Sequence, residues 1–413
     1  PKEKEFILKK FRELISCYFA KEREKKFCPG KTKIGVSGPV FDENEVYEVV
    51  KTLLSGWITT GPKVRSLEEK FAKNLGMKDA IAVNSGSSAN LIALSTLTTK
   101  DLPKDERINP GDEVITPAVT WPTTAYPIVQ VGAIPVFVDV DPETYCMDPE
   151  QVRRAVSRRT KAITLLHMLG HPMDVSPVIE AAEKHGLLVI EDAAEALGAE
   201  YKGRPAGSFG ELSTFSFFAA HQITTGEGGM IVTNSSVYAS IARSLRAFGR
   251  ACVCPTCKVA LDPNYYCPLR HKAEQLGVRG YDKRFVFTNI GYSLKMTELQ
   301  AAFGLKQLEK LSSFLEQRRR NAHHLLKQLK PYSDFLQLPV EKPWAKHAWF
   351  GFAITVKEDA PFTRNEFTRY LERRRIETRP IMAGNIVQQP SMKNVHYKRV
   401  GELPVSKSVM ERS

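Results

Sequence analysis

Four stretches of this 413-residue sequence carry residue types suited to binding a phosphate group or an aromatic ring. The first reads Asn84-Ser85-Gly86-Ser87-Ser88-Ala89-Asn90 and follows a short apolar run at 80–83. Small residues at the start of a helix present free backbone N–H groups and hydroxyls, which together with the helix dipole bind phosphate. An ordinary helix N-cap has the same pattern, so this stretch alone indicates only the start of a helix.

The second and third stretches supply an aromatic plate and two carboxylates. Trp121 stands in the run 117–122 and could stack on an aromatic ring, although a tryptophan of the core fits the pattern equally well. Asp192 and Glu195 follow the apolar run 187–190. A carboxylate at the end of a strand could keep a pyridine nitrogen protonated and make that ring an electron sink. A metal site or a solvated acidic loop is the alternative.

The fourth stretch is the most specific of the set. Residues 213–229 read Ser-Thr-Phe-Ser-Phe-Phe-Ala-Ala-His-Gln-Ile-Thr-Thr-Gly-Glu-Gly-Gly. The histidine in this string is His221, which follows two adjacent phenylalanines and precedes a Gly-rich turn. Because the unperturbed pKa of histidine is about 6.5, close to working pH, His221 could move protons.

Together the four stretches resemble the DegT-type sugar aminotransferase and dehydratase family of fold-type-I pyridoxal phosphate enzymes. The resemblance runs from about residue 34 to the end of the chain and includes the runs 56–62, 139–141 and 291–298. It implies that Gly86, Ser87 and Ser216 contact the cofactor phosphate and that Trp121 stacks on the cofactor ring. By the same resemblance, Asp192 pairs with the pyridinium and Glu195 lies near the ring oxygen. Ser293, where relatives usually have Asn, is implied to reach the cofactor phosphate of a partner subunit.

By the same resemblance, His221 takes the position of the lysine that forms a Schiff base with the cofactor in the aminotransferases. An imidazole cannot form that imine, because its nitrogens belong to an aromatic ring. The dehydratases of the family share this histidine and use pyridoxamine 5′-phosphate, whose amine condenses with a 4-keto sugar. The resemblance implies that His221 removes a proton from the C4′ carbon of the cofactor as the C3 hydroxyl leaves. The alternatives are a binding protein without turnover and, more distantly, an aminotransferase that uses a displaced lysine such as Lys295.

Four thiols lie within sixteen residues of an aperiodic segment at 251–280: Cys252, Cys254, Cys257 and Cys267. Soft ligands at this spacing suit a structural zinc site or a 2Fe–2S cluster, and the Cys-x2-Cys pair alone favours zinc. The branch of the family that acts on CDP-4-keto-6-deoxyglucose carries a 2Fe–2S cluster fed by a flavin and iron–sulfur reductase, so the resemblance favours the cluster. That branch takes one ligand from the position of Ala194. The other cysteines are expected to be ordinary thiols: Cys17, Cys28 and Cys146.

The elements that must position these residues alternate between helices and short apolar strands. Helices are predicted at 43–55, 64–74, 88–97, 296–330 and 364–375, and strands at 80–83, 113–116, 134–138, 162–166, 187–191, 230–233 and 349–356. Such alternation predicts parallel β-α-β units, whose ligands sit at the carboxyl ends of the strands. With the resemblance, it leads us to expect a fold-type-I aminotransferase architecture. This fold combines a three-layer α/β/α large domain with a smaller α+β C-terminal domain.

The expected domains are a helical arm at 1–35, a large cofactor-binding domain at 36–310 that contains the insert 251–280, and a small domain at 311–413. Relatives continue through a further apolar strand, so the C-terminal end is expected to be truncated. A net charge of +13 and a sequence pI near 9.3 suit an anionic nucleotide substrate or an acidic electron-transfer partner, and equally a solvated basic surface.

Several classes of protein do not fit. The sequence has no nucleic-acid-binding motif, no apolar run near the roughly 18 residues of a membrane helix and no signal peptide at its charged start. A cytoplasmic location is expected. The resemblance implies C3 dehydration and deoxygenation of an NDP-4-keto-6-deoxyhexose by a homodimer, in the biosynthesis of deoxysugars such as those of lipopolysaccharide. The alternative is a cluster-free 3-dehydratase that regenerates pyridoxamine 5′-phosphate with glutamate and holds zinc in the insert.

Overall fold

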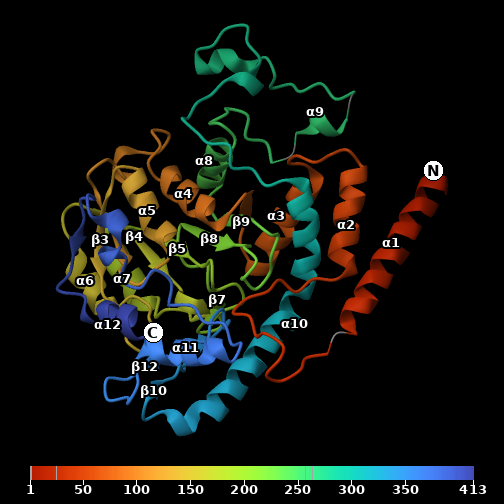
Figure 1. The fold of residues 1–413 in the computed structure, drawn as a ribbon. Helices are drawn as coiled ribbons and strands as arrows, with labels where there is room; N and C mark the ends of the chain where they lie inside the picture. The colour runs from red at the N-terminus through yellow and green to blue at the C-terminus, as the bar shows by residue number, and fades with distance from the viewer. Residues whose placement is uncertain (1, 25, 256, 263) are drawn as a thin grey trace.

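A computed structural model describes residues 2–24, 26–255, 257–262 and 264–413 of the chain. Among these residues, an eight-stranded central sheet has the order β1-β9-β8-β5-β4-β2-β3-β13 (Figure 1). In this sheet, β8, β5, β4, β2, β3 and β13 are parallel to one another, and β9 is antiparallel to both of its neighbours, β1 and β8. The mostly parallel sheet predicted from the sequence is confirmed. The strands are β1 Asp79–Val83, β2 Glu113–Pro117, β3 Ile134–Val138, β4 Thr160–Leu166, β5 Leu188–Asp192, β8 Leu212–Ser216, β9 Gly229–Thr233 and β13 Lys398–Arg399.

Helices surround this sheet, and short strands form two further small sheets. In one small sheet β10 Leu336–Gln337 pairs with β12 Thr355–Val356, and in the other β11 Ala345–Lys346, β6 Glu200–Tyr201 and β7 Arg204–Pro205 lie in that order. The α-helices are α1 Lys2–Arg23, α2 Glu43–Leu54, α3 Pro62–Leu75, α4 Gly86–Thr96, α5 Pro122–Gln130, α6 Pro149–Ala155, α7 Ser176–His185, α8 Ser236–Arg246, α9 Lys258–Leu261, α10 Glu298–Leu329, α11 Arg364–Arg373 and α12 Pro404–Arg412.

Alternate residues of the central strands enter different cores on the two faces of the sheet. In β1, Ile81 and Val83 pack with residues of α4 and α8, whereas Ala80 and Ala82 pack with residues of α3 and α10. Successive side chains of a strand point to opposite faces, so a sheet covered on both sides needs apolar residues throughout its strands. This double burial is the physical reason why the strands are visible in the sequence as continuous apolar runs.

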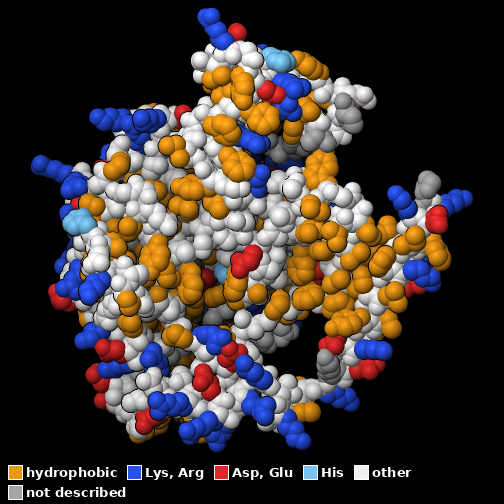
Figure 2. Space-filling view, turned by 45° about the horizontal axis from the view of Figure 1, so that its top comes forward, with side chains coloured by type: hydrophobic (Ala, Val, Ile, Leu, Met, Phe, Trp, Pro, Cys, Tyr) orange, Lys and Arg blue, Asp and Glu red, His pale blue; other side chains and the backbone are white. Residues whose placement is uncertain are grey.

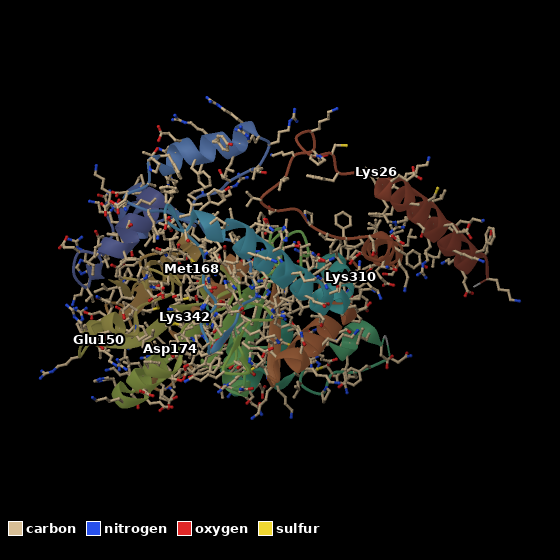
Figure 3. All side chains as sticks on the ribbon, turned by 90° about the horizontal axis from the view of Figure 1, so that it is seen from below. Lys26, Glu150, Met168, Asp174, Lys310 and Lys342 are labelled. Carbon is tan, nitrogen blue, oxygen red and sulfur yellow. The ribbon has the colours of Figure 1, made fainter. Side chains whose placement is uncertain are left out.

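The long helix α10 ties the N-terminal elements to the body of the protein. The buried carboxylate of Glu298 accepts hydrogen bonds at 2.8–2.9 Å from three backbone N–H groups at the start of α3: those of Gly61, Lys63 and Val64. Further along the helix, Lys310 (labelled in Figure 3) forms ion pairs of 2.7–2.8 Å with two carboxylates that begin α2: Asp42 and Glu45. One helix therefore fixes the starts of two others.

Two expectations about strands need correction. The strand predicted at 349–356 is wrong for most of its length, because only β12 is a strand there. Trp349 instead has a left-handed φ of 51°, and the Phe350 N–H bonds to the carbonyl of Leu169 at 3.0 Å. The strand β8 was missing from the prediction, since its buried hydroxyl residues Ser213 and Thr214 interrupt the apolar pattern.

Two segments project from the central body. The helix α1 has no buried residue among those described and carries exposed apolar side chains that Figure 2 shows gathered along this arm: Phe6, Phe11, Leu14 and Tyr18. The cysteine-containing insert stands at the top of Figure 1, away from the central sheet. No helix among the described residues is long and apolar enough to span a membrane.

The predicted division into domains stays a prediction. The helix α10 crosses the predicted boundary between residues 310 and 311, and β13, from the predicted small domain, pairs with β3 at the edge of the central sheet. The C-terminal part of the chain is therefore joined to the central sheet and the preceding elements by a continuous helix and by the pairing of β13 with β3.

We expect Glu298→Ala to lower the free energy of unfolding by about 2–4 kcal/mol, because three backbone donors lose one charged acceptor. Urea denaturation followed by circular dichroism measures this change. The matched control is Glu309→Ala on the same helix, where the carboxylate is exposed and pairs with Lys306, and which should cost less than about 0.5 kcal/mol. Equal losses in the two variants would show that Glu298 does not cap α3.

Candidate active site

The start of α4 forms a close-packed cradle with the ends of β8 and β9. A Cβ atom on Gly86 would lie 2.5 Å from the Cβ and 2.8 Å from the Oγ of Ser216, the last residue of β8. A Cβ on Gly229 would lie 2.4 Å from the carbonyl oxygen of Ser85, which caps α4 by accepting a bond from the Ser88 N–H at 3.1 Å. The free N–H groups of this helix start therefore lie beside a serine hydroxyl, an arrangement that binds phosphate.

Two further residues border the cradle. Ser87, in the first turn of α4, is exposed and donates its hydroxyl hydrogen to Thr123 Oγ1 at 3.2 Å. Ser293 is also exposed, and the adjacent Leu294 carbonyl accepts a bond from the Asn84 N–H at 2.9 Å. The structure thus brings Gly86, Ser87 and Ser216 together and places the exposed segment of Ser293 beside the residue that precedes the cradle.

Asp192 ends β5 as a buried carboxylate fixed by neutral donors. Its Oδ2 accepts hydrogen bonds of 2.8 Å from the Asn90 side chain of α4 and from the Thr124 hydroxyl of α5, and its Oδ1 accepts one of 3.1 Å from the Ala194 N–H. Burial raises the pKa of Asp192 despite these bonds. No described cation forms an ion pair with this carboxylate, so a cationic group bound against it would be stabilised.

The two neighbouring acids have different surroundings. Glu195 accepts a bond of 2.5 Å from the Leu169 N–H, and burial raises its pKa to about 8. Glu195 is therefore mostly protonated at neutral pH and could donate a hydrogen bond to a ring oxygen. Glu191 serves the scaffold instead, because it bonds to the imidazole of His167 at 3.0 Å and to three backbone N–H groups, those of Gly207, Phe209 and Gly210.

Trp121 immediately precedes α5 and is 54% exposed. This exposure excludes the alternative of a core tryptophan. Phe218, on the loop that leads to His221, is 48% exposed. Large exposed aromatic side chains such as these are available to stack on a planar ligand.

His221 presents a neutral imidazole. Its ring centroid lies 4.9 Å from that of Phe350, and its Nδ1 is enclosed and has no hydrogen-bond partner among the described residues. Burial, together with the positive charge of Arg318, lowers the pKa of His221 to about 4. The residue as a whole is only half-buried. A base for proton abstraction needs the neutral form of the imidazole.

Lys295 follows the segment of Ser293 in the chain. Its backbone pairs with Val83 beside the cradle, and its Nζ lies 4.9 Å from the ring centroid of Phe248. Burial lowers the pKa of Lys295, and the nearby Arg250 and Arg246 lower it further. These contacts agree with a role near an anion.

The four insert thiols are only partly gathered. Cys254 and Cys257 are exposed, whereas Cys252 and Cys267 are half-buried. Burial raises the pKa of Cys252, and the neighbouring thiols of Cys254 and Cys257 contribute to this rise, so these three lie close to one another. The described residues nevertheless include no group of three or more His, Cys, Asp or Glu side chains placed to hold a metal ion. The four-cysteine site therefore stays a prediction.

Three site residues escaped the sequence reasoning. Asn90 ends the stretch 84–90, but its bond to Asp192 depends on the packing of α4 against β5. Arg318, in a run of three arginines, donates to the carbonyl of His221 from α10, 97 residues away along the chain. Phe350 packs on His221 from the segment mistaken for a strand. Of these three residues, only Arg318 has a signal in the sequence, because it belongs to a run of three arginines in an otherwise amphipathic helix.

A family model described as the DegT/DnrJ/EryC1/StrS aminotransferase family matches residues 39–413. The chain belongs to this family. The resemblance stated from the sequence and the fold-type-I aminotransferase architecture are therefore confirmed.

Named relatives within the family are similar over nearly the whole chain. The chain is 42% identical to dTDP-4-dehydro-2,6-dideoxy-D-glucose 3-dehydratase of Saccharopolyspora spinosa, over 100% of this chain and 87% of that protein. It is 40% identical to lipopolysaccharide biosynthesis protein RfbH of Salmonella typhimurium, over 94% of this chain and 88% of that protein. Among solved structures, E. coli GDP-4-keto-6-deoxy-D-mannose-3-dehydratase with bound hydrated PLP has a TM-score of 0.80 and 31% identity, covering 92% of this chain and 93% of that chain.

The site of this family member fits pyridoxal or pyridoxamine 5′-phosphate. The cradle at Gly86 offers N–H groups to a phosphate, and Asp192 offers a buried negative charge to a protonated ring nitrogen. Trp121 offers an exposed aromatic face to the ring. These three features match the three chemical parts of the cofactor.

We expect Gly86→Ala to weaken the binding of pyridoxal 5′-phosphate by about tenfold or more, in line with the roughly 1–3 kcal/mol that overpacking costs. The added methyl group would displace the cradle from Ser216. Absorbance titration of the cofactor measures the affinity. Gly38→Ala is the matched control, because a Cβ there meets nothing within 4 Å. Unchanged affinity in Gly86→Ala would exclude this cradle as the phosphate site.

Proposed function

We propose that the chain removes the C3 hydroxyl of an NDP-4-keto-6-deoxyhexose with the help of pyridoxamine 5′-phosphate, and that His221 is the base. The single observation that carries the proposal is the neutral imidazole of His221, whose Nδ1 has no hydrogen-bond partner among the described residues and whose ring packs on Phe350. By the family resemblance, His221 takes the position of the lysine that forms a Schiff base in the family's aminotransferases. A residue that can accept a proton but cannot form an imine supports elimination in place of transamination.

Each described residue of the site has a task in this reaction. When bound, the cofactor supplies an electron-accepting ring that becomes conjugated with the sugar. Asp192 would hold the ring nitrogen protonated, and the cradle of Gly86, Ser87 and Ser216 would hold the phosphate. Trp121 would cover one face of the ring and exclude water. His221 would take a proton from C4′ as the hydroxyl at C3 leaves.

The names of the relatives support this substrate class. One is a 3-dehydratase of a dTDP-linked keto sugar, and another is a 3-dehydratase of a GDP-linked keto sugar. The nucleotides differ, whereas the ketone and the site of dehydration are shared. A third relative is named for lipopolysaccharide biosynthesis, which supports a role in making deoxysugars for a surface glycan.

The source of reducing equivalents depends on the cysteine insert. A 2Fe–2S cluster there would accept electrons from a flavin and iron–sulfur reductase and complete deoxygenation. The proximity of Cys252, Cys254 and Cys257 supports a metal in this segment. The second candidate is a cluster-free dehydratase that regenerates its amine cofactor with glutamate and holds zinc in the insert.

We also propose that the enzyme acts as a homodimer in which Ser293 approaches the partner's cofactor phosphate. The exposure of Ser293, together with exposed apolar side chains on neighbouring elements, supports a covered face: Leu53, Leu54, Ile58 and Phe248. Light scattering coupled to size exclusion tests the oligomeric state directly.

We expect His221→Asn to lower kcat for C3 dehydration by about 10²–10⁴-fold, the usual contribution of a general base. Cofactor affinity should change little, because the phosphate cradle and Asp192 remain. Activity is measured with dTDP- and GDP-4-keto-6-deoxyhexoses, and affinity by absorbance titration. The control is His185→Asn at the exposed end of α7, which should behave like the wild type. Full activity in His221→Asn would remove the histidine from the mechanism.

Metal analysis decides between the two routes of electron supply. Protein purified without oxygen should contain about two irons and two sulfides per chain if the cluster forms. In that case Cys257→Ser should lose iron and Cys17→Ser, altered in the N-terminal arm, should retain it. Zinc or no metal, combined with turnover supported by glutamate without a reductant, would instead establish the cluster-free route.

A further inference from the structure

Arg318 joins two chain segments that flank His221. From α10, its Nη2 donates hydrogen bonds of 3.3 Å to the carbonyls of Ala220 and His221. Its Nη1 donates bonds of 3.1 Å and 3.2 Å to the carbonyls of Trp349 and Phe350. A planar guanidinium with several donors in fixed directions can hold two strands of backbone at once.

Both segments need such support. The Phe350 ring packs on His221 with centroids 4.9 Å apart and a tilt of 46°. The backbone that brings it there passes through Trp349 at a left-handed φ of 51°, a conformation that a bulky side chain rarely adopts. The loop before His221 is not part of any helix or strand. The imidazole and the ring against it therefore depend on tertiary contacts for their relative position.

The charge of Arg318 is used in an unusual way. No described carboxylate pairs with it, and burial lowers its pKa. Its four hydrogen-bond acceptors are neutral carbonyls, so its positive charge is not cancelled and acts on His221, whose pKa it lowers. Among the described residues, no other charged group contributes to this shift.

We propose that Arg318 is the positioning residue of His221: it fixes the loop of the base against the Phe350 wall and aims the imidazole at the reacting carbon. This inference rests on the proposed function of His221. Arg318 itself touches neither the cradle nor Asp192, so its effect on the reaction passes through the histidine.

The next residue on α10 provides a matched control. Arg319 is also half-buried and also donates to backbone carbonyls, at 3.3 Å to His347 and at 3.1 Å to Gly198. It bonds to neither the His221 loop nor Phe350. A general requirement for arginine between α10 and the body would affect both positions equally, whereas positioning of His221 affects only Arg318.

The first experiment compares Arg318→Lys with Arg319→Lys. Lysine keeps the charge but cannot bridge both segments, so kcat of Arg318→Lys should fall by about tenfold to a hundredfold, as expected for a misplaced catalytic group. KM and cofactor affinity should stay near their wild-type values, and Arg319→Lys should retain its kcat. Equal effects of the two substitutions, or a loss confined to KM, would overturn the proposal.

A second readout needs neither substrate nor cofactor. The rate at which diethyl pyrocarbonate modifies His221, followed by mass spectrometry of its peptide, reports how firmly the imidazole is held. Arg318→Lys should raise this rate by about tenfold through local loosening, and Arg319→Lys should not. An unchanged rate would overturn the proposal. This result stands even if His221→Asn keeps full activity, which would overturn only the proposed function.

Phe350→Leu covers the case in which Arg318→Lys does not fold. It leaves α10 intact and removes the ring against His221, so kcat should fall while KM is kept. A wild-type kcat in this variant would contradict the proposal that Arg318 acts by holding the Phe350 ring against His221.

Discussion

A buried carboxylate without a paired cation is the constraint on which the rest of the site depends. Asp192 lies at the carboxyl end of β5, and taking its charge out of water costs free energy that neutral hydrogen bonds offset only in part. Its donors come from α4 and α5, so the same carboxylate fixes how these helices meet the sheet. Once Asp192 is fixed, the cradle at the start of α4 and the tryptophan before α5 stand at set places around one point.

The acids that follow one another on β5 show how neighbouring side chains acquire different chemistry. Glu191 and Asp192 point to opposite faces because side chains alternate along a strand. On one face Glu191 is saturated by donors and becomes part of the scaffold. On the other face, the Asp192 carboxylate has no cationic partner among the described residues and would be stabilised by one. Glu195 lies beyond the strand, and burial raises the pKa of its carboxyl group, which favours the neutral form. One short segment thus supplies a structural anion, a site for a cation and a weak acid.

The parts of the structure that depend on local pattern could be predicted from the sequence. The doubly covered strands appear as apolar runs, the helix start at Gly86 appears as a run of small residues, and His221 stands within a distinctive string. The roles proposed for Asp192 and Trp121 come from the family resemblance, because the residues alone left them open. Contacts between distant segments could not be predicted: Phe350 reaches His221 because the backbone turns at Trp349, where a run of apolar and aromatic residues resembled a strand. The metal ligands of the cysteine insert could not be predicted either. The spacing of the cysteines limits which thiols can share a metal ion, but it does not determine whether they fold together.

The helix α10 fixes the distance between two contacts that lie far apart in the protein. Glu298 at its first turn caps α3, and Arg318, twenty residues later, supports the loop of His221. At a rise of 1.5 Å per residue, these two contacts are about 30 Å apart along a rigid rod. Adding or deleting one residue between them would turn the far end by about 100° and move the arginine away from its carbonyls. The length of this stretch is therefore as much a determinant of the site as the identity of its residues, and changes in chain length can accumulate only outside it.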